Sequence, residues 1–205
     1  MQISPHLTTP YTLPLSTFTT THYPHCTTFI VGAYIFTTPS PSPSPTNSTP
    51  QPQTLLLLRS PTDSYPLHWE NPGGSTDPSD PTLLAALARE VFEETGLPVT
   101  KVVDLVAVDE WTRVRRGRGV REMKWSFLVE VGGGDGEEGD WEERVKLAPE
   151  EHCAWSWVGE EDIRKVVEGG EGIDADGEGH RLRFIGDQGR NLLKAFEVYK
   201  RVYSV

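Results

Sequence analysis

The chain has few cysteines and no long apolar run, and both absences narrow the setting in which it works. Its two cysteines, Cys26 and Cys153, are too few for a disulfide framework, so we expect a reducing compartment. No run of about 18 or more apolar residues is present, which predicts no membrane span and no membrane partner. The first twenty residues contain no arginine and lack the basic and apolar regions of a secretory signal. These features predict a cytoplasmic protein.

Basic residues are also scarce, and the balance of charge limits the partners. The chain has 19 lysines and arginines against 30 aspartates and glutamates, which gives a formal net charge of −11. Because nucleic-acid backbones require a basic surface, we expect no nucleic-acid partner. Clustered carboxylates fit a metal site better, although acidic loops can also serve solubility alone.

Stretches of biased composition account for much of the low hydrophobic share of 36%. Thr37–Gln53 is dominated by Ser-Pro and Thr-Pro pairs, and Gly132–Glu143 is rich in glycine and acidic residues. Neither composition favours a packed core, so both are predicted to be loops. Residues 1–25 are rich in Thr and Pro and have no clear period. We therefore expect an irregular arm over 1–25 and one domain over 26–205.

The remaining sequence predicts several strands with one central and one late helix, plus a short helix at Glu160–Val167. Apolar, β-branched and aromatic runs indicate the strands, and a basic hairpin tip, Arg113–Arg118, separates two of them. The expected strands are Thr27–Phe36, Thr54–Arg59, Leu67–Glu70, Val102–Trp111, Lys124–Val131 and Ala154–Val158. The first two should pair as a hairpin with an oversized connection. In the late helix, Asp187–Tyr203, the residues expected to face inward are Leu192, Leu193, Phe196 and Tyr199. This order favours an α+β (α/β) fold with a mixed sheet.

Start and stop signals frame the central helix. Asp80 and Pro81 predict its start, because Asp caps free backbone N–H groups and Pro suits the first helical position. Gly96 predicts its end, and Pro98 prevents its continuation. Its apolar face is formed at helical spacing by Leu83, Leu84, Leu87 and Val91.

Three carboxylates share another face of this helix. Glu90, Glu93 and Glu94 stand at positions i, i+3 and i+4. Two such charges about 4 Å apart repel by about 1 kcal/mol in water and about 4 kcal/mol at an effective dielectric of 20. Acidic triplets on helices are usually solvated faces. Here the apolar face and the sharp end at Gly96 make the helix a fixed platform, and a hard divalent cation such as Mg²⁺ would turn the repulsion into attraction.

The complete pattern Arg-Glu-x-x-Glu-Glu-x-Gly, from Arg89 to Gly96, is expected by chance only about once in 10⁶ starting positions. The segment Gly74–Leu97 resembles the Nudix box, in which a glycine, five residues, a glutamate and seven residues precede this motif. Asp80 stands where the first glutamate is expected and is separated from Arg89 by eight residues, so a one-residue insertion precedes the helix. The resemblance thus assigns Asp80 no role beyond capping. A later segment, Glu150–Val158, is similar to the late strand of many members of this superfamily.

The resemblance implies an α/β/α sandwich with a mixed sheet and a Mg²⁺-dependent pyrophosphohydrolase, with Mn²⁺ as the alternative ion. The substrate would be a nucleoside diphosphate derivative or a nucleoside triphosphate. The three glutamates and the Gly74 carbonyl would bind the metal, and Arg89 would orient the glutamates. Arg89, Glu93, Glu94 and Glu151 are the expected catalytic residues. For the general base the candidates are Glu94 of the box, and Glu150 or Glu151 before the late strand.

Weaker signals concern the substrate. Trp69, Trp155 and Trp157 could stack on a nucleobase, although Trp in short strands is more often core. Arg113 and Arg115 could contact phosphates, although a solvated hairpin is the commoner role of such residues. His152 fits a satisfied histidine better than a catalytic one. The opposite charge of the basic tip and the acidic body also allows a homodimer, and the oligomeric state stays open.

Alternative functions remain. The first is a non-catalytic nucleotide-binding or regulatory module on the same fold, but all three box glutamates are present. The others are isomerisation of a prenyl diphosphate, for which no further signature is seen, and a structural role resting on the Ser-Pro segment alone. Residues Trp111–Val114 offer neither the proline nor the tyrosine that mark two subclasses of the superfamily. The sequence therefore leaves the substrate open.

Overall fold

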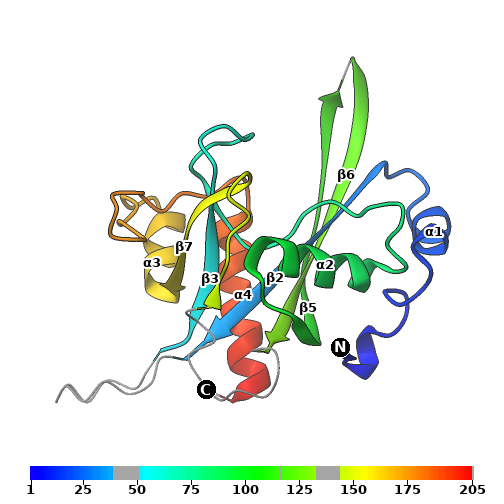
Figure 1. Ribbon diagram of the computed structural model, residues 1–205, viewed down its shortest axis with the longest axis horizontal. Coiled ribbons are helices and arrows are strands. Elements are labelled where there is room, and N and C mark those ends of the chain that lie inside the picture. The colour runs from blue at the N-terminus through cyan, green and yellow to red at the C-terminus, as the bar shows by residue number, and fades with distance from the viewer. Residues whose placement is uncertain (39–50, 116, 133–143, 205) are drawn as a thin grey trace. The chain divides into compact units, whose positions relative to one another are not determined.

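Residues 1–38, 51–115, 117–132 and 144–204 are described by a computed structural model (Figure 1). They form two units, each built from two stretches of chain: Met1–Ala33 with Pro72–Ala148, and Tyr34–Asn71 with Pro149–Val205. Strand β2 (Thr28–Thr37) passes from the first unit into the second. Most of the two loops predicted at 37–53 and 132–143 lies outside the described residues.

The first unit is built on a mixed sheet. Strand β1 (Gln2–Ile3) pairs in parallel with β5 (Val99–Arg115), and β5 pairs antiparallel with β6 (Arg118–Val131). The start of β2 lies beside β6, since the Thr27 N–H donates to the Arg121 carbonyl. Along its other edge β2 receives the segment that leads into the central helix, and Ile30 bridges to Ser75. This sheet therefore fixes the chain just before the helix.

Strands β5 and β6 are longer than the sequence predicted. The turn lies within the expected tip at Arg113–Arg118 but is shorter than predicted, because Arg113 lies inside β5 and pairs with Val120. Side-chain contacts across the strands explain the extra length: the buried Glu122 carboxylate accepts from Trp111 Nε1 at 2.6 Å and from Arg113 Nε at 2.8 Å. Figure 1 shows the paired ends of β5 and β6 extending well beyond the central helix.

The central helix, α2 (Leu83–Thr95), packs its apolar face against β5. Its end at Gly96 is confirmed: this glycine has φ of 70°, a left-handed conformation that it adopts without steric cost. The predicted start at Asp80 is wrong. Thr82 is the N-cap, and its hydroxyl accepts the Ala85 N–H at 3.0 Å. Asp80 lies in the preceding loop because its carboxylate is engaged with a side chain of the helix.

The N-terminal arm (residues 1–25) consists of short helical turns at Pro5–Leu7, α1 (Leu15–Thr17) and Phe18–His22. Phe18 is fully buried, and its ring lies 5.4 Å from that of Trp125 on β6. Tyr11 meets Phe127 edge to face at 5.4 Å. A sequence without a clear period therefore still supplies core residues, because single aromatic side chains need no periodic pattern to be buried.

The second unit is an antiparallel sheet centred on β3 (Gln53–Arg59). Strand β7 (His152–Gly159) pairs along one edge of β3, and the end of β2 and the short β4 (Trp69–Glu70) pair along its other edge. The pairing of Phe36 with Thr54 confirms the predicted hairpin. The strand predicted at 154–158 is also confirmed.

Two helices complete the second unit. Helix α3 (Glu160–Val167) has the predicted bounds, and α4 (Gln188–Tyr203) begins one residue later than predicted, with Asp187 as its N-cap. Leu192 and Phe196 are buried as expected, whereas Leu193 is only partly buried; Ala195 and Val198 are buried with the first two. Small residues thus also belong to the inner face, which a search for large apolar residues overlooks.

Mixed strand pairing and four α-helices within the described residues confirm the α+β class. Among these helices, none combines the length and the hydropathy that crossing a membrane requires.

Phe18→Ala is expected to lower the free energy of unfolding by about 3–5 kcal/mol, because it leaves a cavity among buried aromatic rings. Thr17→Ala, at an exposed neighbouring position, is the matched control and should change it by no more than about 0.5 kcal/mol. Urea unfolding followed by tryptophan fluorescence measures both. Equal stability of the two variants would contradict the burial of the arm.

Candidate functional site

The three glutamates lie on α2 with unequal exposure. Glu94 is 4% exposed, whereas the Glu93 side chain is 56% exposed and that of Glu90 only 12%. The helical spacing predicted from the sequence therefore holds, and it presents one carboxylate to solvent and two to the protein. Because the helix is capped at Thr82 and ended at Gly96, the positions of these groups along it are fixed at both ends.

Arg89 joins the carboxylates to each other. Its Nη1 donates to Glu90 Oε1 at 2.9 Å and to Glu93 Oε2 at 2.8 Å. Its Nη2 donates to the Ser75 carbonyl at 3.1 Å, which ties the helix to the loop before it. The planar guanidinium holds several donors in a fixed fork, so it fixes the direction of the glutamates as well as their charge.

Asp80 holds the opposite side of this guanidinium. Its two carboxylate oxygens accept from Arg89 Nε at 3.0 Å and from Nη2 at 2.9 Å. These hydrogen bonds keep the pKa of Asp80 below its usual range, although burial opposes the shift. The same contact raises the pKa of Arg89 further. From the sequence, Asp80 was assigned to capping alone. The signal that could have indicated its contact with Arg89 is an acidic residue in the loop that precedes a helix carrying an arginine.

Gly73 and Gly74 lie close to the glutamates. The Gly73 N–H donates to Glu94 Oε2 at 2.6 Å. A Cβ on Gly74 would lie under 3.0 Å from the Glu90 carboxylate, and one on Gly73 under 3.0 Å from the Val31 carbonyl. Gly73 also has φ of 145°, which side-chain-bearing residues rarely adopt. The Gly74 carbonyl accepts the Val31 N–H at 2.9 Å, so one of its two lone pairs is engaged.

Trp69 and Glu151 belong to the second unit. Trp69 on β4 is fully buried, which favours a packing role over the predicted stacking on a base. Glu151 is exposed, and its carbonyl accepts the Ser60 N–H at 2.8 Å. The next residue, His152, is 2% exposed and bonded through Nε2 to Glu70 Oε1 at 3.2 Å. The segment that carries Glu151 is thus fixed within this unit.

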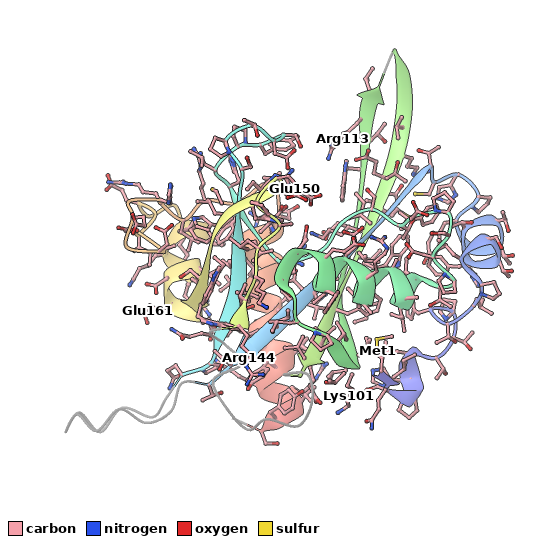
Figure 2. The ribbon with its side chains drawn as sticks, in the orientation of Figure 1. Met1, Lys101, Arg113, Arg144, Glu150 and Glu161 are labelled. Carbon is pink, nitrogen blue, oxygen red and sulfur yellow. The ribbon has the colours of Figure 1, made fainter. Side chains whose placement is uncertain are left out.

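The predicted phosphate contacts lie on the long hairpin of the first unit. Figure 2 shows Arg113 extending from the side of this hairpin. It is held there, with Trp111, by the buried carboxylate of Glu122. Neither Trp111 nor Glu122 was singled out as a site residue from the sequence, because their contact depends on the strand register. The side chain of Arg115 lies outside the described residues.

The group around Arg89 has the donors that a magnesium ion prefers. Glu90, Glu93 and Glu94 offer carboxylate oxygens, and Gly74 offers a carbonyl oxygen, whereas nitrogen and sulfur ligands would favour other metals. The carboxylates also approach one another at a cost that a cation would offset. The chemistry of these residues therefore fits a hard divalent cation.

Asp80→Asn is expected to lower the free energy of unfolding by about 1–3 kcal/mol at neutral pH, because Arg89 loses a charged partner. The folded-state pKa of Asp80 is lowered, so its contribution is present above the unfolded-state pKa of about 3.9 and is lost as the pH falls through the folded-state pKa. The variant should therefore lose less stability on acidification below about pH 4 than the native chain.

Urea unfolding at a series of pH values measures this difference. Glu161→Gln is the matched control, because the Glu161 side chain is 84% exposed. An Asp80→Asn protein with the same pH dependence as the native chain would contradict the ionised contact.

Comparisons with known proteins concern the fold and the family of the chain. The chain resembles the MutT NUDIX hydrolase of Burkholderia pseudomallei, with 17% identity, a TM-score of 0.51, and coverage of 82% of this chain and 96% of that one. A Caenorhabditis elegans Ap4A hydrolase in a binary complex gives 18% identity, a TM-score of 0.53, and coverage of 86% and 99%. Shewanella oneidensis NrtR in complex with a 27mer DNA gives 15% identity, a TM-score of 0.54, and coverage of 84% and 62%.

These identities show a shared fold and no more. No curated protein matches the chain. The family model described as the NUDIX domain matches residues 46–175, which include Arg89, the three glutamates and the glycine pair. Since this match spans more than half of the 205 residues, the chain belongs to the NUDIX family.

Proposed function

We propose that the chain is a Mg²⁺-dependent pyrophosphohydrolase that cleaves a diphosphate linkage in a nucleoside diphosphate derivative or a nucleoside triphosphate. The observation that carries this proposal is the single guanidinium of Arg89, bonded at once to Asp80, Glu90 and Glu93. It arranges carboxylates from a loop and a helix around one point. Such an arrangement suits a cation and its anionic substrate better than it suits a solvated helix face.

In this proposal Glu90, Glu93, Glu94 and the Gly74 carbonyl hold the metal, with Mn²⁺ as the alternative ion. When bound, the cation would neutralise charge on the phosphoryl oxygens. Arg89 and Asp80 act through the glutamates by fixing their direction. The hydrogen bond from Gly73 keeps Glu94 in place, and Gly74 leaves room for the Glu90 carboxylate.

The chemical step is attack of water on phosphorus. A carboxylate takes a proton from the water, the water oxygen forms a bond to phosphorus, and the bridging P–O bond breaks with its electron pair going to the leaving phosphate. Glu93 and Glu94 are candidates for the proton acceptor within α2. The sequence-based alternatives, Glu150 and Glu151, stay predictions.

Arg113 is proposed to contact a substrate phosphate. Its Nε is bonded to Glu122, which fixes the guanidinium at one position on the hairpin. A pre-ordered cation loses less conformational entropy on binding an anion than a mobile side chain does. Trp111, held by the same carboxylate, lies beside it on the same face of the strand. A contact between Arg115 and a substrate phosphate remains a prediction, supported only by the position of this residue in β5.

Hydrolysis is tested with a panel of nucleoside diphosphate derivatives and nucleoside triphosphates, with and without Mg²⁺. The native chain should release a nucleoside monophosphate only with the metal. A Glu93→Gln/Glu94→Gln double variant should lose at least about 100-fold in kcat, because it removes two carboxylates from the cation site. Glu161→Gln is the matched control and should retain activity.

Two results would count against hydrolysis. Tight metal-dependent binding of one compound without turnover of any would favour the regulatory module, the alternative kept from the sequence. Turnover that is unchanged in the double variant would remove the glutamates from the mechanism.

Arg113→Ala should raise KM about tenfold with little change in kcat, because a phosphate contact made equally in the ground and transition states affects binding alone. Arg121→Ala is the matched control. It alters an exposed arginine of the same hairpin, bonded to Glu110 and on the opposite face. Equal KM values for the two variants would place Arg113 outside the substrate site.

A further inference from the structure

We propose that the N-terminal arm is a positioning element for the glutamates of α2, and that Leu15 is its positioning residue. The backbone N–H of Leu15 holds the loop before α2 at Pro81, and this loop holds Arg89 through Asp80. The proposal rests on the function proposed above, since it concerns the same carboxylates. Every contact that it uses lies in the first unit.

The arm is anchored on the sheet independently of α2. At its start, β1 pairs with β5, and the Ser4 N–H donates to the Val102 carbonyl at 3.0 Å. Further along, Phe18 is enclosed by aromatic rings of β2, β6 and the arm itself; these rings are Phe29, Trp125 and Tyr23. Leu7 and Leu15 are buried as well. Such anchors give the arm a defined position from which it can hold another segment.

One hydrogen bond joins the arm to the loop before α2. The Leu15 N–H donates to the Pro81 carbonyl at 2.9 Å. Pro81 directly precedes Thr82, the N-cap of α2. Because Pro81 has a fixed φ and no N–H of its own, its carbonyl is the only backbone group through which the arm can bond this residue.

The neighbouring residue carries the contact to Arg89. Asp80 is 8% exposed and accepts from Arg89 with both oxygens. Its Oδ2 also accepts the Asp77 N–H at 2.7 Å, and its own N–H donates to the Asp77 carbonyl at 2.9 Å. Asp80 is therefore positioned by a tight turn that its two hydrogen bonds with Asp77 close. A shift of the adjacent Pro81 moves the Asp80 carboxylate directly.

Arg89 transmits the position to the glutamates. The donors that it gives to Glu90 and Glu93 belong to the same planar group that Asp80 holds. A small displacement of this plane changes the direction of two proposed metal ligands at once. Loss of the Leu15 contact should thus weaken metal binding without unfolding the protein.

Replacement of Leu15 by proline tests the contact because the site accepts the ring. Leu15 is the first residue of α1, where proline is favoured. Pro14 has φ of −48° and ψ of 133°, the extended conformation that a residue before proline requires. Leu15→Ala is the matched control: both variants shorten the buried side chain, but only the proline variant lacks the N–H.

Two readouts separate positioning from stability. The first is the Kd for Mn²⁺, obtained from the electron paramagnetic resonance signal of the unbound ion. The second is hydrogen exchange of the Asp80 and Ala85 amides, which report on the loop and on the N-cap. Leu15→Pro should raise the Kd roughly two- to tenfold above that of Leu15→Ala, the range expected for one hydrogen bond. Both amides should exchange faster in the proline variant at equal urea midpoints.

A double-variant cycle tests the route through Asp80. If the arm acts through this carboxylate, Leu15→Pro should add little to the loss of Mn²⁺ affinity already caused by Asp80→Asn. An equal effect of Leu15→Pro in both backgrounds would overturn the proposal. So would identical Mn²⁺ affinity and amide exchange of Leu15→Pro and Leu15→Ala.

A backbone ester at residue 15 covers the case in which the proline variant does not fold. It replaces the N–H by oxygen and keeps the side chain. The full chain can be assembled by ligation at Cys26 from a synthetic peptide of residues 1–25 and an expressed remainder. If the native chain neither binds Mn²⁺ nor hydrolyses any diphosphate, the proposed function fails; amide exchange in the ester variant still decides whether the arm positions the loop.

Discussion

The hydrogen bonds of the Arg89 guanidinium are the contacts on which the arrangement of the site depends. On one side they hold Asp80 and the Ser75 carbonyl of the loop, and on the other Glu90 and Glu93 of the helix. Without a cation among them, neighbouring carboxylates at effective dielectrics near 20 repel by several kcal/mol. A lysine could supply the charge but not the planar fork that bonds loop and helix at the same time. One side chain therefore joins the loop to the helix.

Other parts of the first unit hold the loop in the position in which Arg89 bonds to it. The glycine pair brings the loop within reach of the helix, since a side chain at Gly74 would occupy the place of the Glu90 carboxylate. Strand β2 holds the same loop from its other side through the Val31 N–H and the Gly74 carbonyl. The arm holds it at Pro81. Two separate backbone hydrogen bonds and one close approach thus fix a segment that has little regular structure of its own.

What the sequence could predict follows from how local each feature is. The glutamates of α2 were placed correctly because helical spacing depends only on neighbours in the chain. Asp80 was assigned to a cap because Asp and Pro form a local start signal, whereas Thr82, two residues later, provides the cap. Its contact with Arg89 spans nine residues and a change of direction, which no local rule describes.

The full length of the hairpin formed by β5 and β6 was underestimated for a related reason. Arg113 and Glu122 carry no strong strand signal, and their contact with Trp111 appears only in the register of β5 and β6. The arm was described as irregular because its buried aromatic residues follow no period. In both cases the stabilising contacts lie between residues far apart in the sequence, and β-pairing of this kind depends more on packing context than on intrinsic propensity.

The charge of the site is the last consequence of its geometry. Asp80, Glu90 and Glu93 share the single guanidinium of Arg89, which can organise these three carboxylates but cannot neutralise them. Glu94 is almost fully buried, where an ionised group is costly without compensating charge or hydrogen bonds. Evenly matched charges would form a stable ion-pair network with no need of a ligand. The surplus of negative charge instead suits the helix face to the cation proposed above, and through it to the proposed anionic substrate.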